Sequence, residues 1–93
     1  MNIVTDAEFT DLVKNNAVNM LRIIQTDSGK YQVAVSPSWK EGEYLLAIRR
    51  TKNVREWSSL ETLARHIGGK LSKPIPITLE LNATVMAELE GDG

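Results

Sequence analysis

The chain has 93 residues, 42% of them hydrophobic and 25% charged, with a formal net charge of −1 at pH 7. This length and composition are those of one ordinary globular domain, which excludes disorder over the whole chain, and we expect a single domain over residues 1–90 with an acidic, frayed tail over residues 91–93. The absence of cysteine excludes disulfides and thiolate metal sites, and no apolar run reaches the roughly 18–20 residues that cross a bilayer, so we expect a cytoplasmic protein outside the membrane.

The first predicted element is a helix from about Asp6 to Asn15. Thr5 and Glu8 have the spacing of a capping box, in which each side chain binds a free backbone N–H of the first turn. A narrow apolar stripe at helical spacing follows, formed by Phe9, Leu12 and Val13.

Three strands are predicted next, over Val18 to Thr26, Tyr31 to Val35 and Tyr44 to Arg50. A turn at residues 27–30, in which Gly29 accepts a positive φ, joins the first two. Because short turns cannot connect parallel neighbours, these strands form an antiparallel meander. Residues 54–57 are a candidate fourth strand.

A second helix follows, for which Ser58 and Glu61 have capping-box spacing. Its apolar stripe consists of Leu60, Leu63, Ala64 and Ile67. Gly68 and Gly69 end it, and we expect one of them in the left-handed conformation.

The last predicted strand runs from Ile75 to Leu81, with apolar residues at alternate positions. Pro76 places it at a sheet edge, because proline cannot donate to a ladder. The fold class is therefore α+β: a small antiparallel sheet in the order helix, three- to four-strand meander, helix, edge strand, with the helices on one face. An apolar edge strand of this kind often pairs with a second copy, so we expect a homodimer; the alternative is that the helices cover all the apolar surface.

Candidates for catalysis or metal binding are few. His66 is the only histidine, and its position in the second helix is typical of a surface or boundary residue. No nucleophile elbow or glycine-rich phosphate loop is present. We therefore expect a non-enzymatic protein with no catalytic residue, no metal site and no cofactor.

The strongest functional signal is the distribution of charge. Residues 49–73 hold seven basic and two acidic residues, a net +5, while the others hold four basic and ten acidic residues, a net −6. Basic side chains neutralise phosphates, and an adjacent aromatic ring stacks on unpaired bases. We therefore predict a nucleic-acid-binding hairpin, single-stranded or duplex, whose phosphate contacts come from Arg49, Arg50, Lys52 and Arg55 and whose stacking ring is Trp57 or Tyr44. Tyr31 and Trp39 are further aromatic candidates.

Two alternatives stay open for the same residues. The basic side chains pair with Glu41, Glu43 and Glu56 while Trp57 lies in the core, and the hairpin is then only a solvated loop. Alternatively the chain is a protein-interaction module that regulates or inhibits a larger partner, through the basic hairpin or by strand addition at an open sheet edge.

The segment from Val54 to Ile67, VREWSSLETLARHI, resembles a pattern found in small accessory proteins of plasmids and integrative elements, some of them grouped as a ParC-like partition-associated family. The resemblance implies an accessory protein of a mobile genetic element. The strand and helix order is also similar to that of the Whirly family of single-stranded DNA-binding proteins, which is an analogy of fold alone.

Overall fold

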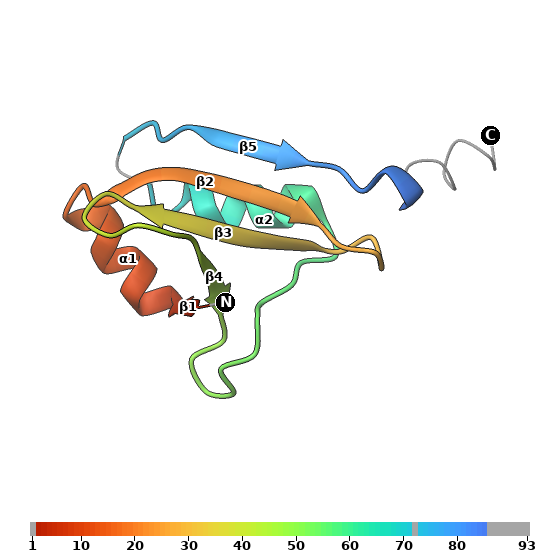
Figure 1. Ribbon diagram of the computed structural model, residues 1–93, viewed down its shortest axis with the longest axis horizontal. Coiled ribbons are helices and arrows are strands. Elements are labelled where there is room, and N and C mark those ends of the chain that lie inside the picture. The colour runs from red at the N-terminus through yellow and green to blue at the C-terminus, as the bar shows by residue number, and fades with distance from the viewer. Residues whose placement is uncertain (1, 72, 86–93) are drawn as a thin grey trace.

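One mixed sheet of five strands organises the chain. The computed structural model describes residues 2–71 and 73–85, and its strand order is β1-β4-β3-β2-β5. The elements in chain order are β1 (Asn2–Thr5), α1 (Asp6–Lys14), β2 (Val18–Gln25), β3 (Tyr31–Pro37), β4 (Tyr44–Ala47), α2 (Leu60–Gly68) and β5 (Ile77–Glu80) (Figure 1). The α+β class is confirmed, and the expected tail at residues 91–93 lies outside the described residues.

The antiparallel meander is the centre of the sheet, as predicted, with β3 between β2 and β4. The expectation of a wholly antiparallel sheet is wrong at both edges. β1, which the sequence did not predict, pairs parallel to β4, and β5 pairs parallel to β2. The intervening helices and strands make these connections long enough for parallel pairing.

The start of α1 is the predicted capping box. The backbone N–H of Glu8 donates to the Thr5 hydroxyl oxygen at 3.3 Å, and the Thr5 N–H donates to the Glu8 carboxylate at 3.0 Å. These bonds satisfy amides that the first turn leaves free. Phe9 and Val13 are the buried residues of the helix, and the face that carries them packs against the sheet.

Both ends of α2 differ from the prediction. Ser59, not Ser58, caps the helix, accepting from the Thr62 N–H at 3.3 Å, because residues 54–57 stay extended and Trp57 bridges to Tyr31. Glu61 pairs with Arg65 one turn on instead of closing a capping box. Gly69 is right-handed at φ −67°, so neither terminal glycine uses the left-handed region. The fourth strand is reduced to two isolated bridges.

The core lies between the two helices and one face of the sheet. Strand alternation and register place on this face the side chains of Val4, Leu46, Val33, Val35, Leu21 and Ile23, all buried. Phe9, Leu63 and Ile67 meet them from α1 and α2. Figure 1 views the opposite, helix-free face, with α2 behind β2 and β3. The predicted placement of both helices on one face is confirmed.

An ionic cluster lies on the helix-free face. Arg22 on β2 donates to both carboxylate oxygens of Glu43, at 2.9 and 2.8 Å, and also pairs with Glu80 on β5. The small side chain of Ala34 lies beside Arg22 on β3 and leaves room for the guanidinium to cross that strand. This cluster fastens the edge strand β5 to the loop before β4.

A second ionic cluster joins the two helices. The carboxylate of Asp6 lies 2.8 Å from His66 Nε2 and 2.8 Å from Lys70 Nζ, and Lys70 also donates to Thr10. Partial burial alone raises the pKa of the Asp6 carboxyl, but the hydrogen bonds from Lys70 and His66 outweigh it and lower the pKa below its ordinary value of 3.8. His66 therefore has a structural partner, in agreement with its interpretation as a boundary residue.

Asp6→Asn is expected to lower the urea midpoint at pH 7. A carboxyl whose pKa is lowered by folding stabilises the fold above its unfolded pKa, and that stabilisation is lost as pH falls through the folded pKa. The difference from the wild type should therefore shrink as the pH falls below 3.8 and the Asp6 carboxyl takes up a proton. The control is Asp11→Asn, at an exposed position of the same helix, and it should follow the wild type over the whole pH range. A difference for Asp6→Asn that is independent of pH would contradict the charge-based role.

Candidate nucleic-acid interface

The predicted basic hairpin is a tight loop that follows β4. The strand ends at Ala47, and the loop closes where the Ile48 N–H donates to the Asn53 carbonyl and the Lys52 N–H donates to the Ile48 carbonyl, both at 2.8 Å. Lys52 has a φ of 63°, in the left-handed region, which reverses the chain here. We call residues 48–55 the basic loop. These backbone bonds close the loop.

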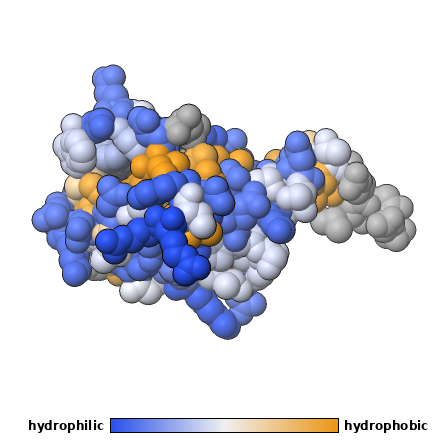
Figure 2. Space-filling view, turned by 90° about the horizontal axis from the view of Figure 1, so that it is seen from below, coloured by the Kyte–Doolittle hydropathy of each residue, from blue (hydrophilic) through white to orange (hydrophobic). Residues whose placement is uncertain are grey.

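Three basic side chains of this loop face solvent: Arg49, Arg50 and Lys52 are all exposed. None forms an ion pair with an acid of residues 2–71 or 73–85. Seen from below, on the side of this loop, the molecule presents strongly hydrophilic side chains in front of a strip of apolar surface (Figure 2). The loop thus carries three positive charges to the surface.

The expected acidic partners are engaged elsewhere or stay apart. Glu43 binds Arg22, and Glu56 accepts a hydrogen bond from Gln32 at 3.1 Å. Lys52 lies close enough to Glu8 to contribute to that carboxyl's lowered pKa, although the hydrogen bonds from Thr5 are the main cause. The described residues therefore show no ion pair between the basic loop and Glu41, Glu43 or Glu56, which was the arrangement that the alternative predicted.

Trp57 lies in the core, and its predicted role as a stacking ring needs correction. The residue is only 5% exposed and exchanges two backbone hydrogen bonds with Tyr31, at 2.8 and 2.9 Å. The guanidinium carbon of Arg55 lies 4.9 Å from its ring centroid, and the His66 ring packs at 5.6 Å. No face is left for a base. Arg55, half-buried on this ring, anchors the end of the basic loop.

Tyr44 is separated from the basic loop by the length of β4. It is half-buried, and Lys40 Nζ lies 5.3 Å from its ring centroid. The same ammonium lies 5.7 Å from the ring of Trp39, which is 66% exposed. Lys40 was not identified as a candidate from the sequence. The available signal was the adjacent pair Trp39 and Lys40 between Pro37 and Gly42, which is typical of an exposed loop with an aromatic and a cationic side chain.

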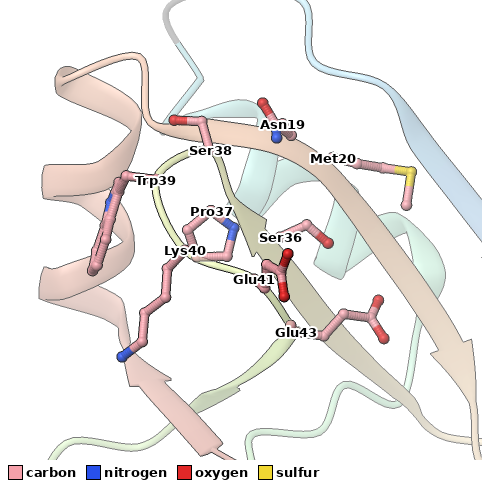
Figure 3. A pocket seen from close by; sticks show the side chains of 10 residues that line it. Asn19, Met20, Ser36, Pro37, Ser38, Trp39, Lys40, Glu41 and Glu43 are labelled. Carbon is pink, nitrogen blue, oxygen red and sulfur yellow. The ribbon is translucent and has the colours of Figure 1, made fainter.

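Shallow hollows surround Trp39. One, of about 620 Å³, lies over the helix-free face between Met20, Ser36 and Glu43 (Figure 3). The second, of about 270 Å³, lies between Trp39 and α1, and its lining includes the acids Glu8 and Asp11. These carboxylates repel phosphate. Glu8 also borders a hollow beside Arg49 and Lys52, so of the three exposed basic side chains of the basic loop Arg50 is the one that does not line it.

Residues 2–71 and 73–85 contain no group of three His, Asp or Glu side chains arranged to hold a metal ion. Within the same part of the chain, no helix is long and apolar enough to cross a membrane. Comparisons of the chain with models of protein families, with curated proteins and with solved structures found no match.

Proposed function

We propose that the protein binds nucleic acid weakly and without sequence preference, through contacts of Arg49, Arg50 and Lys52 with phosphates. The observation that supports this function is the group of three exposed basic side chains on a closed loop, none of them paired with a described acid. Guanidinium groups bind phosphate in a bidentate manner, and a lysine ammonium acts as a point charge.

The mode of binding follows from the neighbouring groups. With Trp57 buried and Tyr44 under Lys40, the basic loop has no predicted aromatic ring free to stack on a base. Affinity then comes from the release of counterions when phosphates are neutralised. We expect no strong preference for single strands, in contrast to proteins that bind unpaired bases on an aromatic platform.

Three phosphate contacts on duplex DNA give a slope of log K against log salt of about −2.7. Raising the salt from about 50 to 200 mM should therefore weaken binding about 40-fold. In the variant Arg50→Glu, Lys52→Glu one such contact is left, so the same change in salt should weaken its binding only about 3- to 4-fold, from a lower starting affinity. Fluorescence anisotropy with labelled duplex and single-stranded oligonucleotides measures both quantities.

The matched control is Lys14→Glu, Lys30→Glu, which changes the charge by the same amount at two exposed positions outside the loop. It should retain the steep dependence on salt. Equal loss of affinity in the control would mean that only net charge matters. Unchanged affinity in the loop variant would refute the proposal.

A protein-interaction module is the second candidate, favoured by Trp39. An aromatic side chain that is 66% exposed beside a hollow lined by Ile3, Leu12, two carboxylates and one ammonium, that of Lys40, suits a peptide segment with an apolar anchor. Under this alternative Trp39→Ala abolishes binding of such a peptide and the basic-loop variant does not.

A role in a mobile genetic element and a cytoplasmic location stay predictions, the first supported only by the resemblance of residues 54–67.

A further inference from the structure

The outer edge of β5 pairs with no other described strand. In the register of β5 with β2, Leu21 lies opposite Ile77, and the Leu21 N–H donates to the Pro76 carbonyl at 2.9 Å. Backbone groups of alternate residues point to opposite sides of a strand, so Pro76, Thr78 and Glu80 face β2. Those of Ile77, Leu79 and Leu81 point away from the sheet.

Pro76 does not protect this outer edge. A proline on an edge strand usually removes an N–H that would otherwise face solvent. Here the parity of the strand directs the missing N–H toward β2. The donors of the outer edge, at residues 77, 79 and 81, are all intact.

The described residues that follow β5, 81–85, also leave this edge open. Asn82 turns inward, where its N–H donates to Gln25 Oε1 at 2.8 Å and its side chain donates to Asp27. Val85 then lies beside Gly29, in the turn between β2 and β3. The described part of the chain therefore crosses the end of β2, away from the free side of β5.

The side chains that accompany this free backbone are apolar. Ile77, Leu79 and Leu81 are 45%, 45% and 51% exposed. Their alternation places all three on the helix-covered side of the sheet, where Ile77 also borders an apolar hollow of about 110 Å³ against Leu63, Ile67 and Leu71 of the α2 region. An open ladder and an apolar row therefore coincide.

We propose that β5 is the homodimer interface, with the occupant a second copy of β5 paired antiparallel about a two-fold axis at Leu79. This register sets Leu79 opposite its equivalent and Ile77 opposite Leu81 of the second copy. The outward backbone groups then exchange hydrogen bonds, and three apolar pairs form on one face. The result is a continuous ten-stranded sheet.

Charge and burial favour this register among those that the backbone parity allows. Shifting the axis to Glu80 sets the two Glu80 carboxylates directly opposite each other, which is unfavourable. Shifting it to Thr78 sets Leu81 opposite Ile75, a residue that precedes β5 and is already partly buried against the core. With the axis at Leu79, Glu80 faces Thr78 of the second copy and keeps its own Arg22. The edge is therefore self-complementary, which a two-fold interface requires.

Sedimentation equilibrium without nucleic acid tests this inference, which is independent of the proposed function. The average mass of the wild type should rise from its chain mass of 10.4 kDa toward twice that value as concentration rises to about 1 mM, which detects association even when the dissociation constant is about 1 mM. Leu79→Lys should remain at 10.4 kDa, because two ammonium groups would meet at the axis. Leu79→Pro should also stay monomeric and folded, because it removes an outward donor and no bond to β2.

The matched control is Ile48→Lys, which makes a similar apolar-to-lysine change at a position that is 44% exposed but lies in the basic loop. It should dimerise as the wild type does, and circular dichroism verifies that each variant is folded. A wild type that stays monomeric throughout overturns the proposal. So does a dimer that survives in both Leu79 variants, or one that Ile48→Lys also dissociates.

Discussion

Trp57→Ala is expected to destabilise the fold by about 3–5 kcal/mol, the usual cost of truncating a buried aromatic residue. The ring is 5% exposed and packs against both Arg55 and His66. Its removal therefore leaves a cavity between the loop after β4 and α2. The free energy of unfolding of a native protein is about 5–15 kcal/mol in total. The loss should therefore lower the urea midpoint by a large amount, measured by circular dichroism.

Trp39→Ala is the matched control, since the same substitution is made at a site that is 66% exposed. It should change stability by no more than about 0.5 kcal/mol. Trp57→Phe should retain most of the packing and, when folded, the salt-dependent binding of nucleic acid. Loss of that binding in a folded Trp57→Phe variant would mean that Trp57 takes part in binding nucleic acid. Equal costs for the two alanine variants would contradict its burial.

Phe9→Ala is expected to cost a similar amount, about 3–5 kcal/mol. Phe9 is fully buried and is the largest side chain that α1 contributes to the core. Alanine is the better helix former, so the loss cannot arise from helix propensity and must come from packing. Equilibrium urea unfolding provides the free energy, with circular dichroism as the signal.

Two further variants separate packing from helix stability in this case. Phe9→Leu keeps an apolar side chain and should cost less than about 1.5 kcal/mol. Asp11→Ala, at an exposed position of the same helix, should stay within about 0.5 kcal/mol of the wild type. A Phe9→Ala protein as stable as Asp11→Ala would mean that α1 is not packed as described.

The parts of the fold that depend on neighbouring residues could be predicted from the sequence. The Thr5 and Glu8 cap, the turn at Gly29 and the meander are determined within a few positions of the chain. β1 could not be predicted, because four residues give too short a pattern and their partner is distant. The direction of β5 was equally hidden, because alternation shows which face is buried and not which way the neighbouring strand runs.

The candidate site divides in the same way. A count of charges located the basic segment, and exposure of Arg49, Arg50 and Lys52 agrees with it. The fate of Trp57 depended on its bridge to Tyr31, a residue 26 positions earlier, which no local pattern contains. Arg55 packs its guanidinium over the ring of Trp57, so its position also depends on that distant bridge.

The parallel edges of the sheet affect the order in which the chain can assemble. Asn2 and Tyr44, paired between β1 and β4, are 42 positions apart, and Leu21 and Ile77, paired between β2 and β5, are 56 apart. Gln25 and Tyr31, in the central hairpin, are six apart. Closing a long loop costs chain entropy before its contacts form. The meander therefore has the lowest entropic cost of formation, and we expect it to form before either edge strand pairs with it. We expect the edge strands to separate from the sheet first when the native molecule opens locally.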